Sequence, residues 1–70
     1  MLANMVMYGV EWRYTSPDLD PGWKMTLREA PCQPWLSQKY EEATAYANSI
    51  RIEGTETRVV EFEMTLKVGA

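Results

Sequence analysis

Two aspartates one residue apart, Asp18 and Asp20, are the side chains best placed for chemistry in this chain. Such a pair could supply two oxygen ligands to a calcium ion. A calcium loop, however, takes about six to eight oxygens and usually ends in a bidentate glutamate, whereas Pro21 and Gly22 follow here. Proline and glycine are typical of turns. The segment 14–23 is therefore predicted to be a long hairpin loop and not a metal site.

Catalytic and cofactor-binding residues are scarce. The chain has no histidine and one cysteine, Cys32, so zinc, iron–sulfur and haem sites lack ligands and a nucleophile lacks a histidine base. Glu61 and Glu63 could do acid–base work, but alternating positions of a strand are more typical of solvated charges. The four glycines are isolated, so no phosphate-binding loop is present. These features favour a non-enzymatic protein without a cofactor.

The single cysteine and the hydropathy pattern bear on location. Cys32 cannot form an internal disulfide, which is typical of proteins of a reducing compartment. No apolar run approaches the roughly 18 residues of a membrane span, and residues 1–7 lack the basic start of a signal peptide. We therefore expect a cytoplasmic protein without a membrane partner.

The charge balance disfavours nucleic acid as the main partner. Ten acidic residues exceed seven basic ones, for a net charge of −3, whereas nucleic-acid binders usually carry a basic surplus. Two alternatives remain open. A sheet face that gathers Arg13, Lys24, Arg28 and Arg58 beside aromatic rings could bind single-stranded nucleic acid, or the chain could be a structural or assembly protein that forms a small homo-oligomer.

Three segments alternate between apolar and polar residues as half-buried strands do. They are 5–14, 22–29 and 57–68, and in the last one the even positions are all apolar from Val60 to Val68. The region between the second and third strands predicts a helix over about 37–52. Ser37 is a suitable N-cap, and Gly54 lies where a helix stop belongs.

The order strand–strand–helix–strand predicts one α+β domain over residues 1–70. We expect a three-stranded antiparallel sheet in the order 2-1-3, with the helix packed on one face. The third strand is then a long edge, which a homodimer or the sheet of another protein could cover. The predicted core comprises Tyr8, Val10, Trp12, Met25, Leu27, Tyr40, Ala43, Ala47, Ile50, Val60, Phe62, Met64 and Leu66.

Several apolar side chains fall outside this pattern. Met5, Met7 and Val59 are expected on the face that meets water, and such a patch suggests a protein partner. Trp35 lies in a proline-flanked loop, where it either packs at the start of the helix or serves as an exposed anchor at an interface.

The layout of two strands, a helix with an alanine-rich face (Glu42-Ala-Thr-Ala-Tyr-Ala47) and a final strand resembles that of short phage and mobile-element proteins. Anti-CRISPR and other anti-defence inhibitors are among them. The resemblance implies a protein that binds a host nucleic-acid-handling complex and blocks it, often through an acidic surface. The partner-binding residues expected on this hypothesis are Glu11, Asp18, Asp20, Trp35, Glu61 and Glu63, with Glu11, Glu61 and Glu63 on one face of the sheet.

Overall fold

The structure, a computed structural model, describes residues 2–28 and 33–67. The expectations for Cys32 and Val68 lie outside these residues. The elements in chain order are the strands β1 (Leu2–Tyr14), β2 (Lys24–Met25) and β3 (Leu36–Ser37), the helix α1 (Tyr40–Ile50) and the strand β4 (Thr55–Lys67).

The sheet is built around β1, which has neighbours on both edges. One edge pairs with β4 along its whole length, from Leu2 opposite Lys67 to Tyr14 opposite Thr55. The other edge pairs with β2 near Trp12 and with β3 near Gly9. All pairs are antiparallel, so the predicted α+β fold, its central first strand and its last strand at an edge are confirmed.

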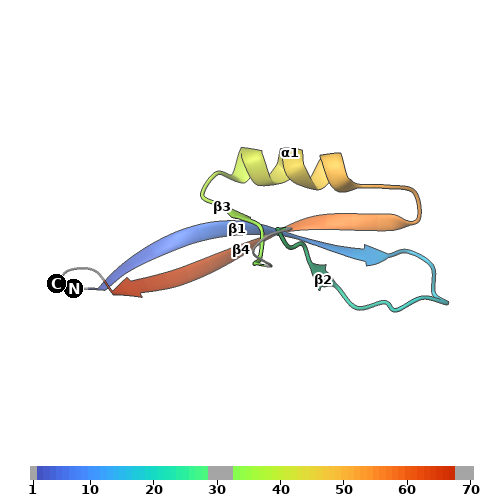
Figure 1. The fold of residues 1–70 in the computed structure, drawn as a ribbon, viewed down its shortest axis with the longest axis horizontal. Helices are drawn as coiled ribbons and strands as arrows, with labels where there is room; N and C mark the ends of the chain where they lie inside the picture. The colour runs from blue at the N-terminus through green and yellow to red at the C-terminus, as the bar shows by residue number, and fades with distance from the viewer. Residues whose placement is uncertain (1, 29–32, 68–70) are drawn as a thin grey trace.

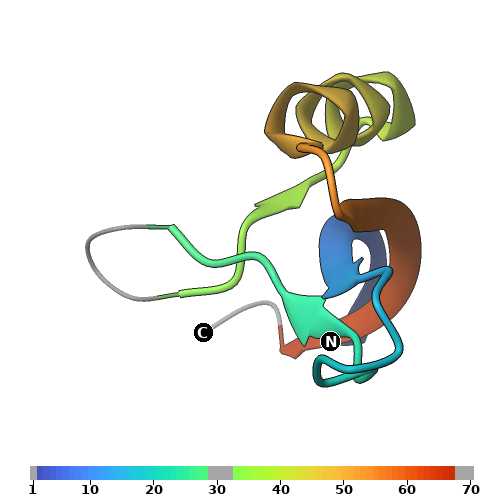
Figure 2. The same ribbon diagram turned by 90° about the vertical axis from the view of Figure 1, so that its right-hand side faces the viewer.

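The predicted strand 22–29 is much shorter in the structure, because the chain leaves β1 after Met25. The amide of Thr26 still donates to the carbonyl of Val10. From there residues 26–28 and 33–35 pair with each other, and these two stretches lie away from β1 (Figure 2). The chain then returns to the same edge of β1 as β3, a strand that the sequence did not indicate.

The helix is also shorter than predicted. Ser37 is buried in β3, and its hydroxyl accepts a hydrogen bond from the Lys39 amide at 3.1 Å. The N-cap residue is Lys39, without a side-chain cap, so the predicted Ser37 cap is wrong. After Arg51 the chain reverses into β4 through Gly54, whose φ of 87° is a left-handed conformation that glycine adopts without strain.

The core between α1 and the sheet is small. Its buried residues are Val10 from β1 and Ala43 and Ala47 from α1, and the two alanines let the helix backbone approach the strands closely. The Thr57 hydroxyl on β4 donates to the Ala47 carbonyl at 3.2 Å and ties the helix to the sheet. Partly buried side chains surround this centre, namely Tyr8, Trp35, Tyr46, Ile50 and Val59.

The helix lies on the face of β4 opposite to the one predicted. Each pair of residues facing each other across β1 and β4 joins an even position of one strand to an odd position of the other, as in Val10 opposite Val59. Since opposite residues share a face, the odd residues of β4 lie beneath α1. Val59 therefore packs, partly buried, against the core and is not on the solvent face where it was expected. The residues predicted for the core that lie on the other face are Met25, Val60, Phe62, Met64 and Leu66, and two more, Leu27 and Tyr40, are exposed.

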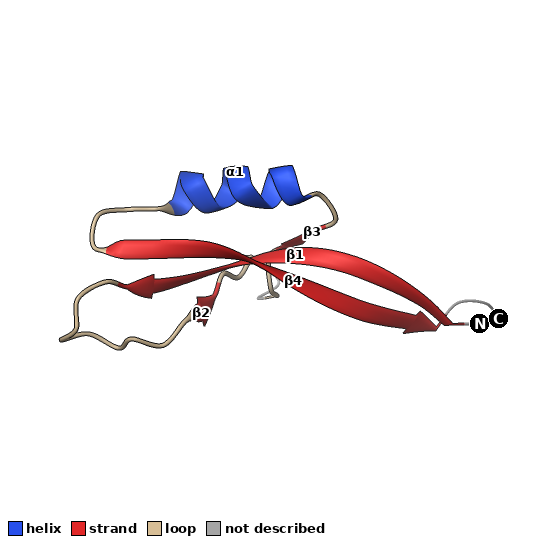
Figure 3. Cartoon of the chain, turned by 180° about the vertical axis from the view of Figure 1, so that it is seen from behind, coloured by secondary structure: helices blue, strands red, loops and turns tan. Residues whose placement is uncertain are grey.

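The molecule is elongated because the β1–β4 pair is longer than the helix. Residues 2–7 and 62–67 project past the start of α1 as a two-stranded ribbon, which we call the ribbon from here on (Figures 1 and 3). The molecule measures 50 × 22 × 22 Å, and its radius of gyration is 14.4 Å, against about 11 Å for a compact domain of this length.

Candidate protein-interaction surface

The two faces of the ribbon differ in character. The face beneath α1 continues as a mixed surface in which Asn4 and Thr65 hydrogen-bond to each other at 3.2 Å across the strands. The opposite face, which we call the apolar face, has no polar side chain within the ribbon. It consists of Ala3, Met5, Met7, Phe62, Met64 and Leu66.

The apolar face begins in a groove at the base of the ribbon. There Phe62 lies against Gly9 and lines a groove of about 250 Å³ together with Met25 of β2, Pro34, Leu36 of β3 and Met64. Met64, at the rim of the groove, is 39% exposed, and Leu66, farther toward the tip, is 37% exposed. A contiguous apolar strip of this kind on a small domain is typical of an interaction site.

The outer edge of β4 offers free backbone groups. The Thr15 amide donates to the Gly54 carbonyl at 3.0 Å. Gly54, an even residue next to β4, therefore directs its carbonyl toward the β1 side of the ladder. Because backbone direction alternates along a strand, the odd residues of β4 direct their N–H and C=O groups to the outer edge. Among the described residues β4 pairs only with β1.

The accessible surface is larger than a chain of this mass usually shows. It measures 5362 Å², whereas a folded monomer of 8.1 kDa exposes about 4500 Å². The excess is roughly 900 Å², as the elongated shape of 50 × 22 × 22 Å requires.

Glu11 was expected on the same face as Glu61 and Glu63, and this prediction is wrong. It occupies the face away from α1, where it forms an ion pair with Arg58 at 2.7 Å, and its side chain is 19% exposed. The neighbouring pair joins Arg13 to Glu56. Glu11 is therefore committed to a charge ladder across β1 and β4.

Trp23 covers this ladder. Its ring lies 4.5 Å from the guanidinium of Arg13 and 4.1 Å from that of Arg58, within the range of cation–π attraction. The ring thereby anchors the end of the loop that was predicted to be a hairpin connection. Its alternation with Met25 predicted that Trp23 lies in the strand 22–29. That alternation gives no sign of the two arginines that lie beneath the ring.

The remaining acidic candidates stay exposed. Glu61 and Glu63 lie on the α1 side of β4, on the outer strand. Asp18 and Asp20 lie in the loop, and Asp20 accepts hydrogen bonds from the Gly22 amide at 2.9 Å and pairs with Lys24 at 3.3 Å. The amide hydrogen bond and, next, the lysine lower the pKa of Asp20. The loop aspartates and the β4 glutamates form separate surfaces.

Trp35 packs against the helix, beyond its first turn. Its ring stacks on Tyr46 of α1 with centroids 4.3 Å apart and an interplanar angle of 11°. Of its two predicted roles, the structure therefore favours packing over an exposed anchor.

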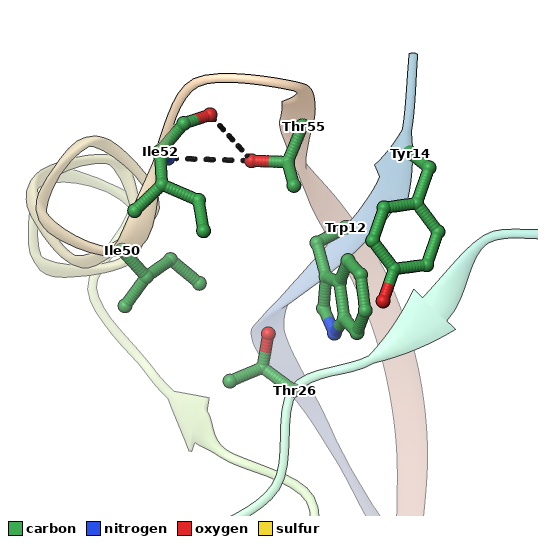
Figure 4. A pocket seen from close by; sticks show the side chains of 6 residues that line it. All are labelled: Trp12, Tyr14, Thr26, Ile50, Ile52 and Thr55. Atoms are coloured by element: carbon green, nitrogen blue, oxygen red, sulfur yellow. Dashed lines mark hydrogen bonds between the residues drawn. The ribbon is translucent and has the colours of Figure 1, made fainter. Parts of the chain in front are cut away.

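One further hollow lies at the other end of the molecule, between the end of α1 and β1 (Figure 4). It has a volume of about 290 Å³, at the small end for ligand pockets. Its lining residues are Trp12, Tyr14, Thr26, Ile50, Ile52 and Thr55. None of these is a carboxylate, an amine or a thiol, so the hollow offers no group for acid–base or nucleophilic chemistry near neutral pH.

Comparisons with protein-family models, curated proteins and solved structures find no match. Within residues 2–28 and 33–67, no three histidine, cysteine, aspartate or glutamate side chains gather where they could hold a metal ion. No helix in that part of the chain has the length and apolar character needed to cross a membrane.

Proposed function

We propose that this chain is a non-enzymatic protein-binding module whose contact element is the ribbon. The observation that carries the proposal is the apolar face, which projects past α1 and leaves Met64 and Leu66 more than one-third exposed.

Paired substitutions on the two faces of β1 test this proposal. Met5→Glu places a charge in the middle of the apolar face, and Asn4→Glu places the same charge one residue away on the opposite face. Binding partners captured from the cells that encode the chain would be purified and titrated with both variants. Loss of a central apolar contact costs about 2 kcal/mol or more, or roughly thirtyfold in affinity. Met5→Glu should show this loss and Asn4→Glu should not. Equal binding by both variants would exclude the apolar face.

In a narrower proposal, the chain is an anti-defence inhibitor that presents acidic side chains to a nucleic-acid-handling complex. It is supported by the exposure of Glu61 and Glu63 on the outer strand, with a spacing of about 7 Å along it. Charge reversal of both residues to lysine should then weaken binding to the captured complex at least about thirtyfold, as loss of interfacial charge pairs does. The same reversal of Asp18 and Asp20 tests the loop. Unchanged binding by both double variants would end this version.

Direct binding of nucleic acid is a weaker alternative. Arg13, Lys24 and Arg58 each have a carboxylate partner in the structure, so binding a phosphate would break an ion pair. Binding of a random oligonucleotide, seen as a shift in its electrophoretic mobility, would support this alternative if the affinity falls steeply with salt. The absence of a mobility shift at low salt would exclude it.

A further inference from the structure

We propose that two copies of this chain pair antiparallel along the outer edges of β4, with Met64 of each copy on the two-fold axis. The inference rests on the proposed function in using the ribbon as the contact element, and it names one partner, a second copy. The protein-binding face described above remains open in this arrangement, because edge pairing uses backbone groups.

The backbone of β4 permits this register. The odd residues of β4 direct their N–H and C=O groups outward, as the ladder alternation requires. Pairing about Met64 brings odd residues opposite odd residues, Glu63 with Thr65 and Glu61 with Lys67 of the second copy. The segment 61–67 then forms about eight new N–H···O bonds across the axis, two for each hydrogen-bonded pair.

The side chains of β4 are self-complementary in this register. Glu61 lies opposite Lys67 of the second copy, twice by symmetry, and opposite charges directly across a sheet attract. On the apolar face Phe62 lies opposite Leu66, again twice, and Met64 lies opposite itself. The apolar faces of the two ribbons thus join into one continuous surface across the axis.

Neighbouring registers are less favourable. Centring on Glu63 would place that glutamate opposite itself, and centring on Phe62 would place Glu61 opposite Glu63, so both bring like charges together. Centring on Thr65 would pair Glu63 with Lys67 but would leave only residues 63–67 in the described part of the ladder. Met64 gives the longest paired segment that contains an attractive charge pair and no repulsive one.

Cysteine cross-linking tests the axis. In a Cys32→Ser background, Met64→Cys brings two Cα atoms to about 4.5 Å at a non-hydrogen-bonded pair, within disulfide range. The matched control, Leu66→Cys on the same face, has its Cα atoms roughly 14 Å apart. Under mild oxidation Met64→Cys should give the linked dimer at least about tenfold faster than the control, because only its sulfur atoms can meet. Equal linking of both variants, or of neither, overturns the register.

Charge exchange tests the contact without a cysteine. Sedimentation of the parent should show a dimer in equilibrium with monomer. Glu61→Lys turns two attractive pairs into two repulsive ones and should raise the dissociation constant about tenfold. The exchanged variant Glu61→Lys with Lys67→Glu should recover the parent value. A parent that is monomeric at every concentration, or an exchanged variant as weak as the single one, overturns the dimer. The Met5→Glu comparison would still decide the proposed function, because it needs no second copy.

Discussion

Gly9→Ala, made in the parent and in Phe62→Ala, tests the face of β4 that lies away from the helix. A Cβ atom on Gly9 would lie 3.0 Å from Cε2 of Phe62 and 3.3 Å from Cδ2 of Leu36. Gly9 is buried, so the ring must shift. Overpacking of this kind costs about 1–3 kcal/mol. Replacing glycine by alanine within a strand returns about 0.5–1 kcal/mol. The net loss of unfolding free energy in the parent should be about 1–2 kcal/mol.

Removal of the ring should reverse the sign. In Phe62→Ala the closest contact is gone, so Gly9→Ala should stabilise by up to about 1 kcal/mol. The coupling between the two sites is then roughly 2 kcal/mol, which is large for a double-mutant cycle and measurable by urea unfolding followed by circular dichroism. Met64→Ala is the matched control on the same strand and face, and there Gly9→Ala should cost what it costs in the parent. An equal cost in all three backgrounds would show that Phe62 does not lie over Gly9. The even residues of β4 would then have to pack against α1, as the sequence predicted.

Three further predictions concern the loop and the core. Trp23→Leu should lower the unfolding free energy by about 1–2 kcal/mol, since two exposed cation–π contacts are lost; an unchanged urea midpoint would contradict this. Asp20 has a pKa below its usual value of 3.8 because the Gly22 amide and Lys24 favour the carboxylate. Its contribution to stability is therefore present above that value and is lost as the pH falls through the folded-state pKa. Asp20→Asn should remove this dependence, and a carboxyl titration by NMR with a midpoint at or above the usual value would refute it. Ala47→Leu should cost about 1–3 kcal/mol through overpacking beneath the helix, as a lowered melting temperature would show, whereas a raised one would mean that the core has room to spare.

The order of the strands could be predicted because it depends on general rules. Alternation identified the first and last strands, and the apolar character of the first placed it in the centre. The spacing of Ala43, Ala47 and Ile50 gave the helix its correct inner side. These features are local or topological, so a single sequence contains them.

Alternation identified the apolar even side of β4 but could not show that this side packs away from the helix. The odd residues lie on the helix side of the sheet. On the other side, Phe62 and Met64 meet Met25, Pro34 and Leu36 and continue into the apolar face of the ribbon. One overlooked signal was length. The 11 residues of α1 span about 16 Å, whereas the 13 residues of β4 span about 43 Å. A helix of that size covers less than half of the strand, so a continuous apolar side must have a second use.

The residues of the candidate site also divide into those that a local sequence pattern predicts and those that depend on long-range pairing. The exposure of Glu61 and Glu63 could be anticipated from their alternation with apolar neighbours. The pairing of Glu11 with Arg58 could not, because it depends on a register that brings together residues 47 positions apart. Trp23 and its two arginines were missed for the same reason.

The β1–β4 ladder also sets the order of events during synthesis. Every residue of β1 has its main cross-strand partner in β4, between Thr55 and Lys67. On a ribosome, β1 emerges first and must wait for almost all of the described chain before its longest edge can be paired. Contacts between such distant segments close slowly, because the intervening loop must be ordered first. During that interval β1 is an apolar strand without its neighbour, which is the kind of segment that chaperones bind and that nascent chains lose to aggregation.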